Sequence, residues 1–114
     1  MGLGDLANLL KGVQVAQSEM KRIKESLEAS EIDGSSADGA VTVRVNGRGE
    51  LLSLKIAPRV IDPQHAAALE GLVCEAVRQA TAKSRQMMQD EMAKAMSAMG
   101  LPNMAGLAGL MGNG

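Results

Sequence analysis

The chain has 114 residues, which is enough for one domain and too few for two. It contains no Phe, Tyr or Trp, so its core must be built from aliphatic side chains and methionine, and recognition of single-stranded nucleic acid by stacking on aromatic rings is excluded. The formal net charge of −1 gives no overall basic bias, so any contact with nucleic acid has to rely on locally clustered charge.

The first predicted element is a helix over residues 5–29, with Asp5 as its N-cap. Apolar residues recur along this stretch with the heptad spacing that places them on one side of a helix. This seam contains Leu6, Leu9, Val13, Ala16, Met20, Ile23 and Leu27. Most of the polar residues lie on the other sides, so the pattern predicts a helix that packs through one face.

A turn-rich segment follows, and it is predicted to hold a short edge strand at about residues 31–35. Two runs of alternating apolar and polar residues come next, on either side of Asn46-Gly47. Alternation around Asn-Gly is a strong hairpin signal, so strands are predicted at about residues 40–46 and 50–57. The apolar face of this hairpin would consist of Val41, Val43, Val45, Leu52, Leu54 and Ile56. A lone hairpin is marginally stable in water, so that face has to be covered by the chain's own helices or by a second copy.

Asp62 followed by Pro63 predicts the start of a second helix, because Asp is a good N-cap and Pro fits the first helical turn. The helix is predicted to run over residues 63–99 and to end at Gly100-Leu-Pro102. At 1.5 Å per residue its length is roughly 55 Å, so it is too long to lie wholly on the hairpin. Its methionine-rich distal half must project, pair with the first helix or meet a partner chain.

The remaining residues, 101–114, are predicted to form a flexible tail of Gly, Leu and Met. Although no charged residue occurs after Lys94, Pro102 and several glycines interrupt this region, so it does not fit a membrane span. The first residues also lack the basic segment of a signal peptide. The sequence therefore predicts a single domain over residues 1–100 without a signal peptide or a membrane span.

The sequence offers no pattern typical of a catalytic or metal site. His65 is the only histidine and Cys74 the only cysteine, and neither has a partner at a spacing typical of nucleophilic or acid–base catalysis. His65 is expected to be a solvated residue of the first helical turn, and Cys74 a small buried apolar residue. Carboxylates are scattered without the spacing of zinc or calcium ligands. We therefore expect no enzyme, no cofactor and no metal.

Basic and amide side chains gather on the two predicted helices. They are Lys11, Gln14, Gln17, Lys21, Arg22 and Lys24 on the first helix, and Lys83, Arg85 and Gln86 on the second. Such residues are usually a solvated surface with some pairing along the helix. If the two helices pair, the same residues would form a surface suited to phosphate contacts that do not read sequence. The residues alone leave both interpretations open.

Three segments, in this order, resemble the YbaB/EbfC family of bacterial nucleoid-associated proteins. They are Gly39-Ala-Val-Thr-Val-Arg-Val-Asn-Gly47, Leu54-Lys-Ile-Ala-Pro-Arg-Val-Ile-Asp62 and the ending Gly100-Leu-Pro102. The resemblance covers almost the whole chain. It implies an α+β fold with an α-β-β-β-α protomer, in which two long helices flank a small antiparallel sheet, and a tweezer-like homodimer.

The resemblance also implies sequence-tolerant binding of duplex DNA that alters DNA conformation, with roles in nucleoid organisation, gene regulation or DNA protection. It further implies a place in the cytoplasmic nucleoid, with no membrane contact. By position, the basic and amide residues named above would contact DNA, and the six apolar hairpin residues would lie in the dimer interface. An alternative is a protein-interaction module that docks recombination proteins or other partners through the methionine-rich helix and the tail. A pull-down that survives nuclease treatment would distinguish this alternative.

Overall fold

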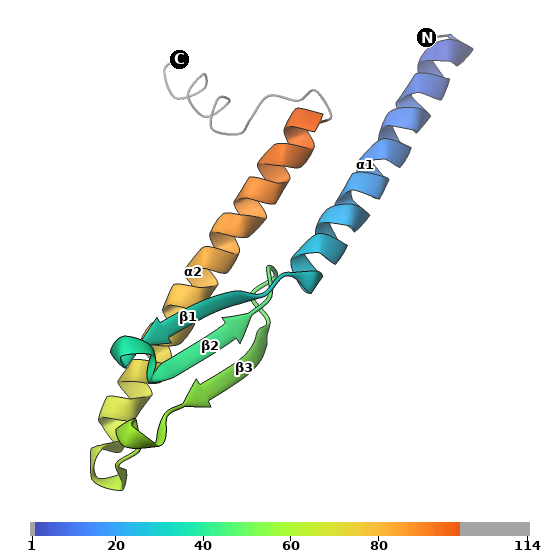
Figure 1. The fold of residues 1–114 in the computed structure, drawn as a ribbon. Helices are drawn as coiled ribbons and strands as arrows, with labels where there is room; N and C mark the ends of the chain where they lie inside the picture. Colours follow the sequence, from blue (N-terminus) through green and yellow to red (C-terminus); the bar gives the residue numbers. More distant parts are fainter. Residues whose placement is uncertain (1, 99–114) are drawn as a thin grey trace, which may run out of the picture. The chain divides into compact units, whose positions relative to one another are not determined.

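The protein has two long helices and a three-stranded antiparallel sheet (Figure 1). A computed structural model describes residues 2–98. Its main elements in chain order are α1 (Leu3–Ala29), β1 (Ile32–Ser36), β2 (Val41–Val45), β3 (Leu51–Ile56) and α2 (Ala66–Ala98). The predicted α+β fold with the order α-β-β-β-α is confirmed. The predicted end of the second helix at Met99 and the tail over 101–114 lie outside the described residues, and the homodimer stays a prediction.

The chain consists of two compact units, residues 1–25 with 90–114, and residues 26–89. The second unit contains the whole sheet, the last turn of α1 and the larger part of α2. The described residues of the first unit are the N-terminal part of α1 and the last turns of α2. The sheet and the helix segment that covers it are therefore built within a single unit.

Helix α1 begins two residues earlier than predicted, at Leu3, so the expected N-cap at Asp5 is wrong. Asp5 lies in the first turn, where its Oδ2 accepts a hydrogen bond from the Gly2 N–H at 3.4 Å. A carboxylate at the third helical position often reaches back in this way to the backbone before the helix. The acid therefore stabilises the helix start from inside the first turn.

The predicted start of the second helix at Asp62-Pro63 is confirmed, with one difference in the first turn. Asp62 Oδ1 accepts a hydrogen bond from the Gln64 N–H at 3.0 Å, as an N-cap does. Pro63–His65 forms a turn of 3-10 helix, and the α-helix proper starts at Ala66. The His65 Nδ1 lies 2.7 Å from Asp62 Oδ2, so both carboxylate oxygens of Asp62 are engaged.

The core lies between α2 and one face of β1 and β2. Val41, Val43 and Val45 of β2 are at most 1% exposed and pack against Ala76 and Ala80 of α2. The half-buried residues around this cluster are Ile32, Ile56, Val60, Leu69, Leu72, Val73 and Val77. Small alanine side chains let the helix axis come close to the strands, so valine can fill the remaining space.

Gly34 in β1 makes this close approach possible. It pairs with Val43, at the middle of the sheet. A Cβ at Gly34 would lie 2.3 Å from the Ala76 carbonyl oxygen and 2.6 Å from the Ala80 nitrogen. Both contacts are with helix backbone, which cannot rotate away as a side chain can. The position of α2 over β1 and β2 therefore depends on the absence of a side chain at Gly34.

The hairpin between β2 and β3 is confirmed, but its loop is longer than a two-residue Asn-Gly turn. Asn46 pairs with Glu50 through an N–H···O bond of 3.0 Å, which leaves residues 47–49 in the loop. Gly49 has a φ of +82°, and the Gly49 N–H donates to the Asn46 carbonyl at 3.0 Å. This matches a type I turn followed by a left-handed residue, the usual three-residue hairpin loop. The Asn46 side chain accepts from the Arg48 and Glu50 N–H groups, which fixes the loop.

The register of β3 shifts by one residue beside this loop. Val45 pairs with Leu51, whereas Arg44 pairs with Ser53, so Leu52 is an extra residue in a β-bulge. Strict alternation therefore holds only from Ser53 to Ile56. Leu51, rather than the predicted Leu52, therefore shares the apolar face with its partner Val45.

The apolar face of the hairpin is only partly covered within one chain. The β2 valines are buried under α2, whereas Leu51, Leu52 and Leu54 of β3 are 59%, 49% and 43% exposed. The predicted dimer interface included the three valines, but the chain's own helix already covers them. Only the β3 part of the predicted interface, Leu52 and Leu54 with half-buried Ile56, is available to a second copy.

Candidate nucleic-acid interface

Five of the predicted contact residues form one stripe along α1. Lys11, Gln14, Gln17, Lys21 and Lys24 follow each other at spacings of three or four residues, which places them on one side of the helix. All five are exposed. At 1.5 Å per residue the stripe is about 20 Å long, which corresponds to about six base pairs of duplex at 3.4 Å each. We call these five residues the α1 basic stripe.

Arg22, the sixth predicted residue on α1, is already paired within the helix. Its Nη2 and Nε lie 3.0 and 3.2 Å from Glu19 Oε2. This is an exposed pair at i,i+3 spacing, and such pairs contribute little to stability. The Glu19 carboxylate nevertheless offsets the charge of Arg22. Arg22 is therefore a weaker candidate for phosphate contact than Lys21 or Lys24.

The three predicted residues on α2 have different surroundings. Lys83 Nζ donates a hydrogen bond to the Asp33 carbonyl of β1 at 2.9 Å, so its ammonium is tied to the sheet. Arg85 is exposed and has no ion pair with any residue between 2 and 98. Gln86 is exposed as well. These residues belong to the sheet-containing unit, whereas the α1 basic stripe belongs to the other unit.

Arg78 is a candidate that the sequence interpretation missed. It precedes Arg85 by seven residues, so both lie on the side of α2 that faces away from buried Ala76 and Ala80. Its side chain is exposed and makes no ion pair within the described chain. The seven-residue spacing of the two arginines was the signal in the sequence that could have identified it.

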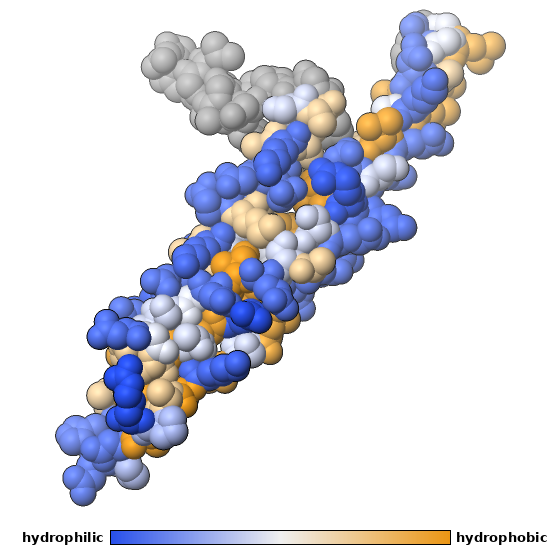
Figure 2. Space-filling view, in the orientation of Figure 1, coloured by the Kyte–Doolittle hydropathy of each residue, from blue (hydrophilic) through white to orange (hydrophobic). Residues whose placement is uncertain are grey.

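Beside the basic stripe, α1 exposes much of its apolar surface. Seven large apolar side chains of this helix are each at least 47% exposed: Leu3, Leu6, Leu9, Leu10, Val13, Val15 and Met20. Figure 2 shows orange, apolar patches on α1 near its N-terminal end. The predicted seam is buried only at its last two members, Ile23 and Leu27. No other part of residues 2–98 therefore covers most of the seam.

A hydrogen bond and an ion pair join the last turn of α1 to the hairpin loop. The Gly47 N–H donates to the Leu27 carbonyl at 2.8 Å, and a Cβ at Gly47 would lie 2.9 Å from both the Leu27 Cα and oxygen. Arg48 adds an ion pair with Glu28 at 2.7 Å. The loop thus satisfies a carbonyl that the helix end would otherwise leave unpaired.

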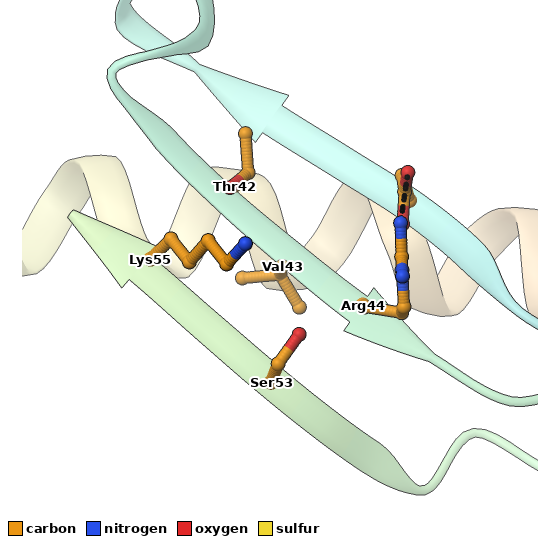
Figure 3. A pocket seen from close by; sticks show the side chains of 6 residues that line it. Thr42, Val43, Arg44, Ser53 and Lys55 are labelled. Atoms are coloured by element: carbon orange, nitrogen blue, oxygen red, sulfur yellow. Dashed lines mark hydrogen bonds and ion pairs between the residues drawn. The ribbon is translucent and has the colours of Figure 1, made fainter. Parts of the chain in front are cut away.

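The sheet face opposite α2 carries the polar hairpin residues (Figure 3). A shallow hollow there is lined by Thr42, Arg44, Ser53 and Lys55 with Asp33. Arg44 contacts Asp33 at 2.9 Å and Glu31 at 3.3 Å, so two carboxylates balance its charge. Arg44 is therefore a cross-strand structural residue, and this face is less suited to phosphate than the α1 basic stripe.

Two carboxylates are expected to make the fold sensitive to acid. The hydrogen bond from Arg44 lowers the pKa of Asp33. The hydrogen bond with His65 and, to a smaller extent, the hydrogen bond from the Gln64 N–H lower the pKa of Asp62. A carboxylate whose pKa is lower in the folded than in the unfolded state stabilises the fold at pH values above its unfolded pKa of about 4. This stabilisation is lost as the pH falls through the folded pKa. We expect the melting temperature to fall between about pH 5 and pH 2, and Asp33→Asn to flatten that fall in melts followed by circular dichroism.

The control for this experiment is Asp38→Asn, because Asp38 is an exposed carboxylate outside the described ion pairs. It already adopts a left-handed conformation, with a φ of +55°, which asparagine tolerates well. This control should keep the full acid dependence. Equal acid dependence in Asp33→Asn and the unmodified protein would contradict the expectation.

The described residues contain no group of three metal-ligating side chains. Cys74 is exposed, so the expectation that it is buried is wrong. Neither α1 nor α2, within residues 2–98, is both long and apolar enough to span a bilayer.

Comparisons with known proteins agree on one family. A model of the YbaB/EbfC DNA-binding family matches residues 1–99. A nucleoid-associated protein of Clostridium perfringens is 42% identical over 103 residues, which cover 90% of this chain and 92% of that protein. One of Alkaliphilus metalliredigens is 34% identical over 103 residues, which cover 90% of each chain. The crystal structure of an uncharacterized protein from Helicobacter pylori has a similar fold, with a TM-score of 0.58, 22% identity and coverage of 72% of this chain and 92% of that one.

Proposed function

We propose a function that starts from one premise: this chain belongs to the YbaB/EbfC DNA-binding family. The protein binds duplex DNA with little sequence preference. It is located in the nucleoid and takes part in organising it. The observation that carries this proposal is the α1 basic stripe, a row of exposed lysine and glutamine side chains on one side of a helix.

The chemistry of the stripe suits the DNA backbone better than the bases. Lysine is a point charge for phosphate, and the glutamine amide donates to phosphate oxygens as readily as to base edges. The stripe contains no arginine, the side chain that most often reads guanine in the major groove. The absence of aromatic residues removes stacking on bases. Phosphate contact therefore dominates binding, which makes it tolerant of sequence.

We propose that the protein acts as a homodimer. Two copies carry two basic stripes, and two separated contacts allow a protein to bend one duplex or to bridge two. The outward arginines Arg78 and Arg85 of α2 add two further cationic groups per chain. Effects on DNA conformation, and through it on gene expression or DNA protection, would follow from this arrangement.

The test is a fluorescence anisotropy titration on two duplexes of unrelated sequence at several salt concentrations. Both duplexes should bind with similar affinity, and log K should fall linearly with log salt. In the Lys21→Ala/Lys24→Ala variant we expect weaker binding on both duplexes alike. The salt slope should fall by roughly 2 per chain, because two phosphate contacts are removed.

A matched control removes the same charge from other positions. Lys55→Ala/Lys94→Ala lies outside the stripe, since Lys55 is on the sheet and Lys94 pairs with Glu91 at 3.5 Å. Its slope should stay close to that of the unmodified protein. Equal losses in both variants would show that net charge, rather than the stripe, determines binding. Failure of the unmodified protein to bind either duplex at low salt would favour the protein-interaction alternative, which the exposed apolar side chains of α1 support.

A further inference from the structure

Only two residues separate α1 from β1, and this short connection brings the end of the helix to the hairpin loop. Helix α1 ends at Ala29 and β1 begins at Ile32, which pairs with Val45 at the end of β2. The hairpin loop, residues 47–49, follows directly after Asn46. All of these residues belong to the sheet-containing unit. The sheet and its loop therefore place the end of α1 within one unit.

The loop contacts the backbone of α1 through Gly47, which is buried. The Gly47 N–H donates to the Leu27 carbonyl at 2.8 Å. A Cβ at Gly47 would lie 2.9 Å from both the Cα and the carbonyl oxygen of Leu27, so a larger residue there would push the loop and the helix apart. Ser30 Oγ donates to the Ser26 carbonyl at 2.7 Å, so this carbonyl of the helix end is bonded as well.

The same loop is bonded to α2. Ser84 Oγ donates to the Asn46 carbonyl at 3.0 Å, and these two residues are 3% and 5% exposed. The Gly49 N–H donates to the same carbonyl, also at 3.0 Å. A buried hydroxyl that lost its partner would stay out of water without a hydrogen bond, which is unfavourable and therefore keeps the loop on α2. A continuous set of contacts runs from α2 through the loop to α1.

The ion pair between Arg48 and Glu28 is a smaller part of this arrangement. The two side chains are 44% and 42% exposed, and exposed ion pairs contribute little. The buried contacts of Gly47 and Ser84 are therefore the ones that determine where the last turn of α1 lies.

We propose that the hairpin loop is a joint that fixes the direction in which α1 leaves the sheet, with Gly47 and Ser84 as its positioning residues. This inference rests on the proposed DNA binding, because it assigns what orients the α1 basic stripe. Lys24, the last residue of the stripe, lies about one turn before Leu27. Helices bend sharply mainly at proline or glycine, and neither occurs in residues 13–29. The direction set at the last turn therefore extends along most of the stripe.

The joint should affect the conformation of bound DNA rather than the number of phosphate contacts. Gly47 and Ser84 are both buried, so neither contacts DNA itself. Changing them leaves every cationic group of the stripe in place. The salt slope of binding depends on how many phosphates are neutralised, whereas bending depends on where the contacts lie along the duplex. A joint variant should therefore keep the slope and change the bend.

Residual dipolar couplings of the backbone amides test the joint in the absence of DNA, because they give the orientation of α1 relative to the sheet. Gly47→Ala forces the loop away from Leu27 and should change this orientation. Gly71→Ala is the matched control, since its Cβ would meet no atom within 4 Å, and it should keep the orientation of the unmodified protein. Ser84→Ala removes one hydrogen bond and adds no atom, so this variant should fold and change the orientation in a milder way.

A duplex labelled with fluorophores at both ends tests the consequence for DNA. With Gly47→Ala at saturation we expect a shifted energy-transfer efficiency and the salt slope of the unmodified protein. An orientation of α1 that is unchanged in both Gly47→Ala and Ser84→Ala would overturn the joint, whether or not the protein binds DNA. A changed orientation with unchanged energy transfer would overturn its effect on DNA conformation. A changed orientation in a protein that binds no duplex would support the joint while the proposed function fails.

Discussion

Replacing Gly34 with alanine is expected to lower the free energy of unfolding by about 3 kcal/mol, at the upper end of the usual cost of overpacking. The added Cβ would lie 2.3 Å from the Ala76 carbonyl oxygen, 2.6 Å from the Ala80 nitrogen and 2.9 Å from the Ala80 Cβ. No side chain can rotate to relieve these contacts, so α2 has to move away from β1. That movement would open the space that the buried β2 valines now fill. Thermal unfolding followed by circular dichroism should show a melting temperature lower by roughly 4–8 °C per kcal/mol.

Gly71→Ala provides the matched control on α2. A Cβ at Gly71 would meet no atom within 4 Å, so the substitution brings no clash. Alanine is favoured over glycine in a helix by up to about 1 kcal/mol, and this variant should therefore melt at the same or a higher temperature. If the melting temperature of Gly34→Ala equals that of Gly71→Ala instead of lying well below it, α2 does not lie against β1 at Gly34.

The Val43→Asp substitution is expected to prevent folding. Val43 is 1% exposed and packs against alanine side chains, so an aspartate there would lose its hydration and find no partner. Burying an unpaired polar or charged group costs several kcal/mol, a large share of the roughly 5–15 kcal/mol by which small domains are stable. We expect the helical circular dichroism signal to be largely lost at 25 °C.

The control for Val43→Asp is Leu51→Asp on the neighbouring strand. Leu51 is 59% exposed, so its carboxylate would stay in water and the chain should fold. The two variants carry the same added charge and differ in burial. A folded Val43→Asp protein would show that the valine row is not the centre of the core.

Much of the fold could be predicted from the sequence because its signals are local. Alternation on either side of Asn46 specified the hairpin, and Asp62-Pro63 specified the start of the second helix. Both depend on the conformational preferences of a few neighbouring residues. The Asp5 N-cap failed for the same reason, because the helix can begin earlier when nothing in Gly2 or Leu3 prevents it.

The parts that could not be predicted depend on contacts between distant residues. Alternation identified one apolar face of the hairpin but could not tell which strand α2 would cover, since that is decided by the fit of Gly34 to Ala76 and Ala80. The role of Lys83 was missed for a similar reason, because its partner Asp33 lies fifty residues earlier in the chain. In the candidate interface, the α1 basic stripe needed only helical spacing and was identified from sequence.

The outer edge of β1 also has a consequence for pairing with strands of other chains. The Ser35 N–H donates to Gln79 Oε1 at 2.7 Å, and Lys83 Nζ donates to the Asp33 carbonyl at 2.9 Å, so side chains of α2 occupy backbone groups that an added strand would need. A sheet grows only by adding strands at an open edge, so a further strand cannot pair with β1 at these residues. The same two α2 side chains thus protect this edge against the open-ended stacking that leads to fibrils.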